Sequence, residues 1–174
     1  MRPPPAAFGA LALVLALPLA AGGASAATPP PIQGSVDRIV VEKAARRMNL
    51  YAGERLVRTY RISLGGGGLA PKVRSGDRRT PEGDYRITGR NPNSRYHLSL
   101  RIGYPTPAQA AAARAQGIDP GGDIMIHGMP NGRGPLAALY QGRDWTDGCI
   151  AVTDSEIEEV WTLVRDGARV RITP

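Results

Sequence analysis

The sequence predicts a mainly β domain, built as a sandwich or barrel-like mixed sheet with two peripheral helices at about residues 107–116 and 154–166. Several short segments alternate apolar and polar residues, which is typical of strands with one buried face. Glycine, proline and small polar residues separate these segments, and only two stretches have helix signals. A chain of 174 residues is long enough for one domain with a full-sized core, so we expect no second module.

The N-terminal residues have the pattern of a secretory signal peptide. Arg2 gives a positive start, residues 6–21 form an apolar run, and Ala24-Ser25-Ala26 matches the small residues that precede a signal-peptidase cut. We therefore expect a signal peptide over residues 1–26 and an exported protein of the periplasm or cell envelope. Because Pro18 interrupts the run, which is also short for a bilayer, we expect no stable membrane insertion after cleavage.

A proline-rich linker is predicted over residues 27–35, followed by the folded domain over residues 36–174. The domain opens with three expected strands, joined by tight turns as in an antiparallel sheet with one solvated face. Their alternating residues are Ile39 and Val41 in the first strand, Met48 and Leu50 in the second, and Leu56, Arg58, Tyr60, Ile62 and Leu64 in the third.

The middle of the chain alternates loops and strands. The four glycines at positions 65–68 lack the Gly-Lys-Ser/Thr ending of a phosphate-binding loop, so we interpret them as a plain loop. The polar segment 72–84 precedes a strand with Tyr85 and Ile87, and a further strand pattern covers residues 96–102.

Both predicted helices have boundary signals. Thr106-Pro107 suits an N-cap followed by the first helical residue, and the alanine-rich run after it ends at Gly117. In the second helix, Thr153-Asp154-Ser155-Glu156 is a capping box. The apolar stripe that follows, closed by Gly167, has helical period and consists of Ile157, Val160, Trp161 and Val164. The alternating Arg169-Val170-Arg171-Ile172 predicts a last strand.

The charge balance favours an anionic partner. The formal charge is +7, and since Arg2 is the only charged residue before residue 27, the rest of the chain has 21 Lys and Arg against 15 Asp and Glu, or +6. Nucleic acid is the generic partner of such a chain, but the basic residues are scattered, without a basic helix or an aromatic-interleaved stripe. We therefore expect no nucleic-acid binding, and a solvated basic surface that suits an acidic polymer.

The residues with catalytic chemistry gather in two stretches, Ile124-Met125-Ile126-His127-Gly128 and Trp145-Thr146-Asp147-Gly148-Cys149-Ile150. These hold the only cysteine of the chain and one of its two histidines. Alternation places Met125 and His127 on one face of a strand, so that His127 ends the strand beside a glycine. Gly148 lets the backbone approach a substrate closely and can leave adjacent amide N–H groups free for an oxyanion. The pattern predicts an acyl-transfer site.

A nucleophilic cysteine needs a base or a positive neighbour, because a free thiol with a pKa near about 8.5 is mostly protonated at neutral pH. His127 is the candidate base for Cys149, since the glycines and prolines between them let a loop bring the two side chains together. Two alternatives remain open. Cys149 and His127 can both be buried structural residues, and His97, on a strand face with Ser99 and Arg101, is a rival base or a pocket-lining residue. Two histidines and one cysteine lack the close spacing of a zinc site, so we expect no metal and no cofactor.

His127-Gly128, a loop with glycines and prolines, and Thr146-Asp147-Gly148-Cys149-Ile150 together resemble the signature of the YkuD family of L,D-transpeptidases. The chain departs from the family pattern at Asp147, where most members have a second histidine, and at Ala151, where many have Asn or Arg. Both departures resemble the YafK-like branch. Further matches to that branch extend the resemblance over about residues 36–174: Arg79-Thr80-Pro81-Glu82-Gly83, Arg90-Asn91-Pro92-Asn93-Ser94, His97-Leu98-Ser99-Leu100 and Pro120-Gly121-Gly122-Asp123.

The resemblance implies a YkuD-like fold and a cysteine enzyme that acts on the peptide stem of peptidoglycan, in cell-wall synthesis or remodelling. Cys149 would attack the carbonyl on the L-centre side of an L–D peptide bond and hold the stem as a thioester, with His127 as general base and acid and the Gly148 backbone in the oxyanion hole. Capture of the thioester by an amine gives transpeptidation, and capture by water gives a carboxypeptidase or a hydrolase of cross-links or attachments. The residues expected to bind substrate are His97, Arg79, Thr146, Asp147 and Gly128.

Three points stay open at this stage. A catalytically silent wall-binding domain, in which the thiol and imidazole are structural, is the alternative from another class of protein. The partners beyond the stem peptide include a wall-attached protein as acyl acceptor or substrate, and we expect a monomer. Asp147 can orient His127 as the third member of a triad, or it can be a solvated loop residue whose charge raises the pKa of Cys149.

Overall fold

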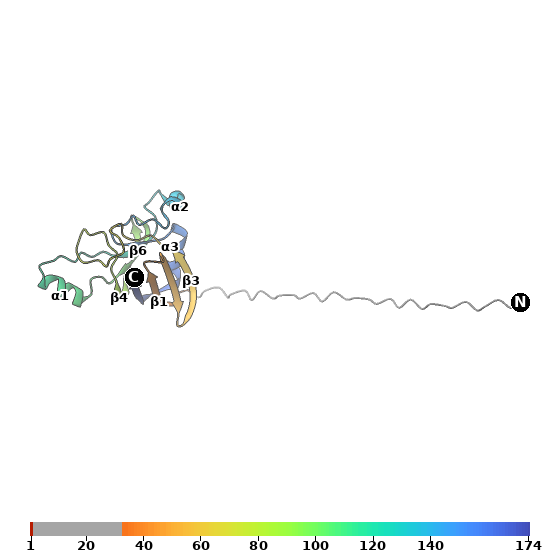
Figure 1. Ribbon diagram of the computed structural model, residues 1–174, viewed down its shortest axis with the longest axis horizontal. Coiled ribbons are helices and arrows are strands. Elements are labelled where there is room, and N and C mark those ends of the chain that lie inside the picture. Colours follow the sequence, from red (N-terminus) through yellow and green to blue (C-terminus); the bar gives the residue numbers. More distant parts are fainter. Residues whose placement is uncertain (2–32) are drawn as a thin grey trace. The chain divides into compact units, whose positions relative to one another are not determined.

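The computed structural model describes Met1 and residues 33–174, and Figure 1 shows its strands and helices. Apart from Met1, the predicted signal peptide lies outside the described residues, as does most of the predicted linker. The strands are β1 (Val36–Glu42), β2 (Arg47–Ala52), β3 (Arg55–Arg61), β4 (Gly83–Ser94), β5 (His97–Ile102), β6 (Met125–His127), β7 (Ile150–Ala151) and β8 (Val164–Thr173). The helices are α1 (Pro107–Ala115), the short 3₁₀ helix η1 (Gly134–Leu136), α2 (Ala137–Tyr140) and α3 (Asp154–Leu163).

The strands of the described residues form one mixed sheet in the order β3-β2-β1-β8-β4-β5-β6-β7. β1 is parallel to β8 and β6 is parallel to β7, whereas the other neighbouring strands are antiparallel. The first three strands pair as an antiparallel meander, which confirms the prediction for this part of the chain. The last strand, β8, lies between β1 and β4, so the first and last strands are neighbours inside the sheet.

The sheet curls until its two ends meet. Ser63, just after β3, and Ala151 of β7 exchange two backbone hydrogen bonds of 2.9 Å. Gly65 and Thr146 form a second bridge close by. We call these two bridges the seam of the sheet. The barrel-like mixed sheet that the sequence predicts is therefore confirmed, and the chain around Cys149 lies along its seam.

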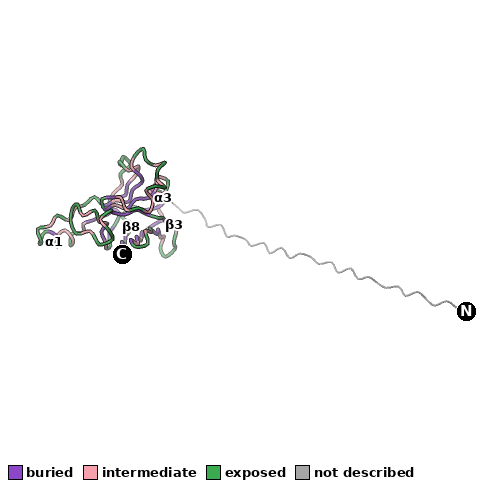
Figure 2. The backbone as a smooth tube through the Cα atoms, turned by 45° about the horizontal axis from the view of Figure 1, so that its top comes forward, coloured by how far each residue is buried: buried purple, intermediate pink, exposed green. Residues whose placement is uncertain are grey.

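Apolar side chains of the alternating strands fill the interior of the curled sheet. Figure 2 shows the buried residues concentrated along the strands, with exposed residues in the loops. Burial of one such side chain stabilises the fold by about 1.5–3 kcal/mol relative to leaving it in water. The fully buried members of this core include Ile39, Val41, Met48, Leu50, Ile62, Leu100, Ile126 and Ile150.

The two predicted helices are present but pack differently. α3 buries Ile157, Val160 and Leu163 in the core and packs against β5 and β6. α1 buries only Ala113 and lies at one end of the domain in Figure 1. Both begin with the predicted capping boxes, at Thr106 and Thr153, and in each box the N-cap hydroxyl accepts a hydrogen bond from a backbone N–H.

α3 ends at Leu163, earlier than the predicted end near residue 166. Val164 has extended backbone and pairs with β1, so it begins β8 instead of completing the helical stripe. A β-branched residue suits this strand position, and pairing with β1 decides between the two structures. Gly167, expected to close the helix, lies inside β8 with a φ of +74°, where the pairing with β1 shifts register. β8 is therefore longer than the predicted strand over residues 169–172.

β4 is also longer than the alternation around Tyr85 and Ile87 indicates. It continues through Pro92 to Ser94 and contains two register shifts relative to β5. Its first half pairs with β8 and its second half with β5, so this strand joins the two halves of the sheet. In the loop between β6 and β7, the structure forms η1 and α2, which the glycine and proline content did not predict.

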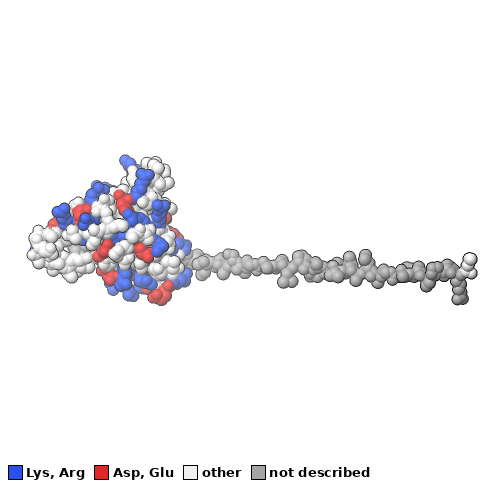
Figure 3. Space-filling model, in the orientation of Figure 1, with Lys and Arg blue, Asp and Glu red and all other residues white. Residues whose placement is uncertain are grey.

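Acidic and basic side chains are mixed over the face of the domain that Figure 3 shows. One exposed ion pair of the domain joins Arg171 and Asp84. In the part of the chain that the structure describes, no helix is both long enough and apolar enough to cross a membrane.

Candidate active site

Neighbouring strands place His127 and Cys149 in the same cleft. His127 ends β6 and pairs in register with Ser99 of β5 and Ala151 of β7. β7 is parallel to β6, with Ile150 beside Ile126. Cys149, which directly precedes β7, therefore lies beside Met125. The cleft has a volume of about 340 Å³. Besides Cys149 and His127, it is lined by Asn91, Asn93, Ser94, Arg95, Tyr96, Ser99, Arg101, Asp123 and Met125.

The backbone of Gly128 selects the tautomer of His127. Nδ1 of His127 lies 2.7 Å from the carbonyl oxygen of Gly128. Because a carbonyl can only accept, Nδ1 donates its proton and Nε2 keeps a lone pair. The side chain is 3% exposed, and this burial lowers the pKa of His127, while the hydrogen bond to Gly128 acts in the opposite direction. At neutral pH, His127 is therefore an uncharged imidazole that can accept a proton at Nε2.

Aromatic rings hold this imidazole in place. The ring of Tyr96 lies against it at a centroid distance of 4.5 Å, and Trp145 contacts it edge-on at 5.9 Å. Tyr140 packs edge-on against Trp145 at 5.5 Å, so Trp145 connects α2 to His127. Contacts of this kind restrict the rotation of the imidazole.

The thiol of Cys149 is protonated in the resting site. Burial raises the pKa of Cys149, and the carboxylates of Asp147 and Asp123 raise it further, whereas a backbone hydrogen bond from Met125 lowers it. Sγ donates a hydrogen bond of 3.5 Å to the carbonyl oxygen of Asp123. With the pKa of the thiol raised and that of His127 lowered, the resting pair is neutral and not a thiolate–imidazolium ion pair. Nucleophilic attack then requires His127 to take the proton as the sulfur reacts.

Thr146 shapes the turn that presents Cys149. Its hydroxyl donates to the Cys149 carbonyl oxygen at 2.7 Å and accepts from the Gly148 N–H at 3.2 Å. Across the seam, the Thr146 N–H donates a hydrogen bond to the Leu64 carbonyl oxygen, and the Thr146 carbonyl oxygen accepts one from the Gly66 N–H. Thr146 is 5% exposed and lies outside the lining of the cleft, so its contacts hold the loop.

Gly148 supplies a conformation that other residues rarely adopt. Its φ is +126°, and a Cβ there would lie 2.7 Å from the carbonyl oxygen of Arg79. Its N–H is engaged by Thr146, whereas the N–H of Cys149 has no hydrogen-bond partner in residues 33–174. The backbone donor available to an oxyanion is therefore that of Cys149, presented by the turn at Gly148.

Asp147 is an exposed residue paired with Arg78. Its Oδ1 accepts a hydrogen bond of 2.9 Å from Nε of Arg78, and its side chain is 89% exposed. Gly128 binds Nδ1 of His127, and Asp147 binds Arg78, so the described residues show no hydrogen bond between the Asp147 carboxylate and this nitrogen. The role of Asp147 in turnover stays a prediction.

His97 does not share the cleft with Ser99 and Arg101, although strand alternation predicts one face for all three. It follows the β4–β5 turn with a φ of +65°, and this left-handed backbone directs its side chain elsewhere. Nε2 of His97 lies 2.7 Å from a carboxylate oxygen of Glu158 in α3. His97 therefore joins the β4–β5 turn to α3.

Gly128 and Arg79, both expected to bind substrate, contribute structural contacts outside the lining of the cleft. A Cβ on Gly128 would lie 2.7 Å from Oδ1 of Asp154 and 2.9 Å from Cγ2 of Ile157, so β6 approaches α3 too closely for a side chain. The carbonyl of Arg79 packs against Gly148, and its Nε donates to the carbonyl oxygen of Gly67 at 3.2 Å. The Arg79 side chain lines a neighbouring hollow and not the cleft of Cys149.

The cleft therefore combines Cys149 and His127 with residues that the sequence analysis did not assign to it. Arg95 and Asp123 lie in a turn and in the segment before β6, where no periodicity indicates their direction. Tyr96 was expected to begin a strand, but it lies in the turn between β4 and β5. For Ser99 and Arg101 a signal existed, since both alternate along a strand, but the partner strand was unknown. The structure shows that this partner strand is β6, in a register that places Ser99 opposite His127 and Arg101 opposite Met125.

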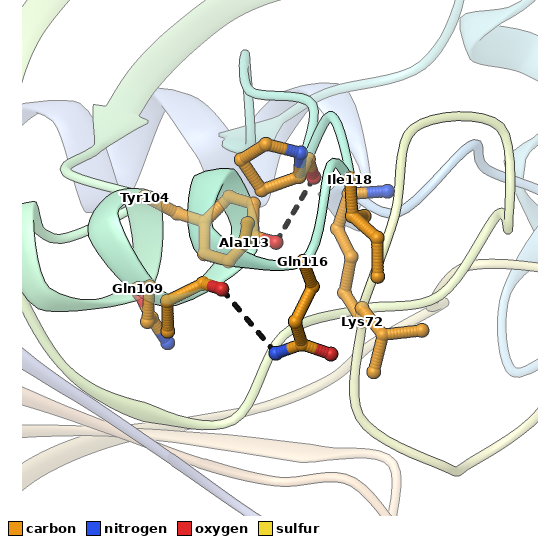
Figure 4. Close-up of a pocket in the computed structure, with 9 residues that line it drawn as sticks. Lys72, Tyr104, Gln109, Ala113, Gln116 and Ile118 are labelled. Carbon is orange, nitrogen blue, oxygen red and sulfur yellow. Dashed lines mark hydrogen bonds between the residues drawn. The ribbon is translucent and has the colours of Figure 1, made fainter.

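A second hollow, of about 220 Å³, lies beside α1 and is shown in Figure 4. Its wall includes Lys72, Tyr104, Gln109 and Ile118, and the Tyr104 hydroxyl donates to the carbonyl oxygen of Pro120 at 3.0 Å. It contains neither the cysteine nor a histidine. Within residues 33–174, no group of three or more His, Cys, Asp or Glu side chains is arranged to hold a metal ion.

Comparison with known proteins gives one consistent family. Residues 36–172 match the family model of the L,D-transpeptidase catalytic domain, YkuD. "Putative L,D-transpeptidase YafK" of Escherichia coli K12 is 34% identical over 139 residues, which cover 76% of this chain and 49% of that protein. "Putative L,D-transpeptidase YkuD" of Bacillus licheniformis is 31% identical over 137 residues, or 79% of this chain and 66% of that protein. The chain thus spans about half the length of YafK.

A solved structure has the same fold. The crystal structure of the helical cell shape determining protein Pgp2 from Campylobacter jejuni superposes with a TM-score of 0.61 and 24% identity, covering 82% of this chain and 50% of that one. Because the family model matches residues 36–172 and YafK is 34% identical over 76% of this chain, the chain belongs to the YkuD family of L,D-transpeptidase catalytic domains.

Proposed function

We propose that this chain is a cysteine-dependent L,D-transpeptidase that acts on peptidoglycan stem peptides in the cell envelope, through a thioester on Cys149. The observation that carries the proposal is the shared cleft, in which a protonated thiol lies with a neutral imidazole whose Nδ1 is occupied by Gly128. Family membership supports the substrate class, and the cleft supports the mechanism with a thiol, a neutral imidazole and a free backbone N–H that suit the roles of nucleophile, base and oxyanion donor.

The steps follow from these groups. Nε2 of His127 takes the proton of Sγ while the sulfur bonds to the stem carbonyl carbon, and the Cys149 N–H donates to the oxyanion. The imidazolium then returns the proton to the leaving nitrogen, the carbon–nitrogen bond breaks, and the D-residue leaves. An amine or a water molecule, activated by the same imidazole, resolves the thioester. The amine route gives transpeptidation, and the water route gives carboxypeptidase activity or release of a wall-attached protein.

Intact-protein mass spectrometry tests the proposal. The protein, incubated with a stem tetrapeptide that ends in D-alanine, should gain the mass of the acyl group and release free D-alanine. Cys149→Ser should give neither, because a serine hydroxyl is far less acidic than a thiol. An acyl-enzyme in the serine variant would contradict the assignment of the nucleophile. Binding of wall fragments without an acyl-enzyme in the wild type would identify a silent wall-binding domain. A labelled amine in the same reaction separates the transpeptidase from the hydrolase.

A further inference from the structure

Ser99 presents a buried hydroxyl that the fold leaves without a partner. Among the described residues, its Oγ is one of only three buried side-chain polar atoms that make no hydrogen bond. Ser99 is 1% exposed, yet it lies in the wall of the cleft that holds Cys149 and His127. A buried hydroxyl without a partner costs about 1–3 kcal/mol, so such groups call for an explanation at a candidate active site.

The sheet order places His127 between Ser99 and Cys149. Ser99 is on β5, His127 is directly opposite it on β6, and Cys149 precedes β7, the next strand. Directly opposed side chains on an antiparallel pair have Cβ atoms about 4.5–5.5 Å apart, so the hydroxyl and the imidazole are neighbours. Arg101 and Met125 form the adjacent pair along the same two strands.

This order orients a reacting peptide, if the proposed mechanism holds. The carbonyl carbon must lie at Sγ of Cys149, and the leaving nitrogen must lie at Nε2 of His127, which protonates it. The bond that breaks therefore points from β7 towards β5. The leaving residue continues in that direction, and one residue spans about 3.3–3.6 Å against a strand spacing of about 4.8 Å. The carboxylate of a leaving amino acid thus reaches the position of Ser99.

We propose that the Ser99 hydroxyl binds the carboxylate of the leaving D-amino acid and so selects donors that end in a free D-residue. The inference rests on the proposed function and deepens it, because it names the group that recognises the leaving residue. The hydroxyl donates its proton to the carboxylate, which gives the buried Oγ the partner that the fold does not supply. The Ser99 hydroxyl also lies beside the amine or water molecule that His127 activates to resolve the thioester.

Two donors that differ in one carboxyl group test this. One is a stem tetrapeptide ending in D-alanine, and the other ends in an ethylamide, which is D-alanine without its carboxyl group. Rates of acyl-enzyme formation are measured by mass spectrometry for wild type, Ser99→Ala and Ser99→Thr. Ser99→Ala should slow the D-alanine donor about tenfold or more and change the ethylamide rate less than about twofold, since only the first donor loses a charged hydrogen bond. Ser99→Thr keeps the hydroxyl and should retain most of the selectivity.

Ser35→Ala is the matched control. The Ser35 hydroxyl is also buried without a partner in the described residues, but it precedes β1, several strands away from β6. This variant should react like the wild type with both donors.

Equal slowing of both donors by Ser99→Ala, or no slowing of either, would overturn the inference while the proposed function stands. No acyl-enzyme in the wild type with either donor would instead overturn the proposed function and the inference with it. Alkylation of Cys149 by iodoacetamide at the wild-type rate shows that the Ser99→Ala site is intact.

Discussion

At the scale of single residues, the neutral resting state of Cys149 and His127 determines how the site responds to pH. Burial disfavours the charged form of each group, so it raises the pKa of Cys149 and lowers the pKa of His127. As pH falls, His127 is protonated only below its usual range, so it remains a base in mildly acidic surroundings. In a cysteine enzyme with a preformed thiolate, the pKa of the cysteine would instead be lowered.

The first prediction concerns the charge of Asp147. Alkylation of Cys149 by iodoacetamide should follow an apparent pKa above that of a free cysteine, because burial and nearby carboxylates raise it. Asp147→Asn removes one of these charges, so it should lower this apparent pKa and leave turnover within about twofold. Asp166→Asn removes another exposed carboxylate that pairs with an arginine, outside the cleft, and is the control. A collapse of turnover in Asp147→Asn would show that this carboxylate orients the base.

The second prediction compares the two histidines. His127→Ala should lower the acylation rate about 10²–10⁴-fold, because proton transfer is lost. His97→Ala should lower it less than about tenfold, since its ring binds Glu158 of α3 and lies outside the cleft. Single-turnover acylation with the D-alanine donor measures both effects, and thermal unfolding of each variant shows whether the fold persists. The reverse ranking would assign the base to His97.

At the scale of elements, the two capping boxes offer a comparison within one chain. Loss of an N-cap hydroxyl costs about 0.5–2 kcal/mol where the helix is part of the cooperative fold. Thr153→Ala should reduce the free energy of unfolding by about 1 kcal/mol, because α3 contributes three residues to the core. Thr106→Ala should have a smaller effect, since α1 buries only Ala113 and can unfold locally. Urea denaturation measures both, and an equal loss would mean that α1 is as tightly coupled to the core as α3.

Elements were predictable where one local signal decides the structure. The alternation of Ile39, Val41, Met48 and Leu50, and the capping box at Thr153, each have one physical interpretation, and the structure confirms it. Val164 allowed two interpretations, because an apolar valine suits both a helical stripe and a strand. Pairing with β1, more than a hundred residues earlier in the chain, resolved it. No local pattern contains that information.

The same limit applies to the candidate site. Cys149 and His127 could be paired because their chemistry is rare in this chain. The neighbours of the pair depend on the register of β5 against β6 and on the positive φ of His97, neither of which alternation reports. Ser99 was visible as a strand residue but could not be placed opposite the base.

At the scale of the whole molecule, Lys43 links the first turn of the domain to the candidate site. It is fully buried, and its Nζ donates to the carbonyl oxygen of Thr80 at 3.1 Å and to Glu82 at 2.7 Å. The Thr80 hydroxyl accepts from the N–H of Gly65, which forms the seam with Thr146. The buried Lys43 therefore supports, through Thr80, the bridge between Gly65 and Thr146 that precedes Cys149.

The fourth prediction follows from this position. Lys43→Met keeps the length of the side chain but leaves the Thr80 carbonyl and Glu82 without their donor, so the free energy of unfolding should fall by about 3 kcal/mol. Arg171→Met breaks an ion pair with Asp84 in which both partners are exposed and screened by water, so it should reduce the free energy of unfolding much less than Lys43→Met does. Urea denaturation of both variants tests the difference. Equal losses would show that burial adds nothing to the Lys43 pair.

The seam between Ser63 and Ala151 also bears on how the protein reaches its active form. Its contacts join distant parts of the chain, since Ser63 and Ala151 are more than eighty positions apart in sequence. Folding slows as the contacts that must form become more distant in sequence, so a closed sheet of this kind should fold in milliseconds to seconds, not microseconds. The loop with Cys149 has no local helix or hairpin to hold it before these contacts form. Tryptophan fluorescence and the reactivity of the thiol should therefore change together during refolding, because the loop with Cys149 reaches its final position only when the entire sheet has closed.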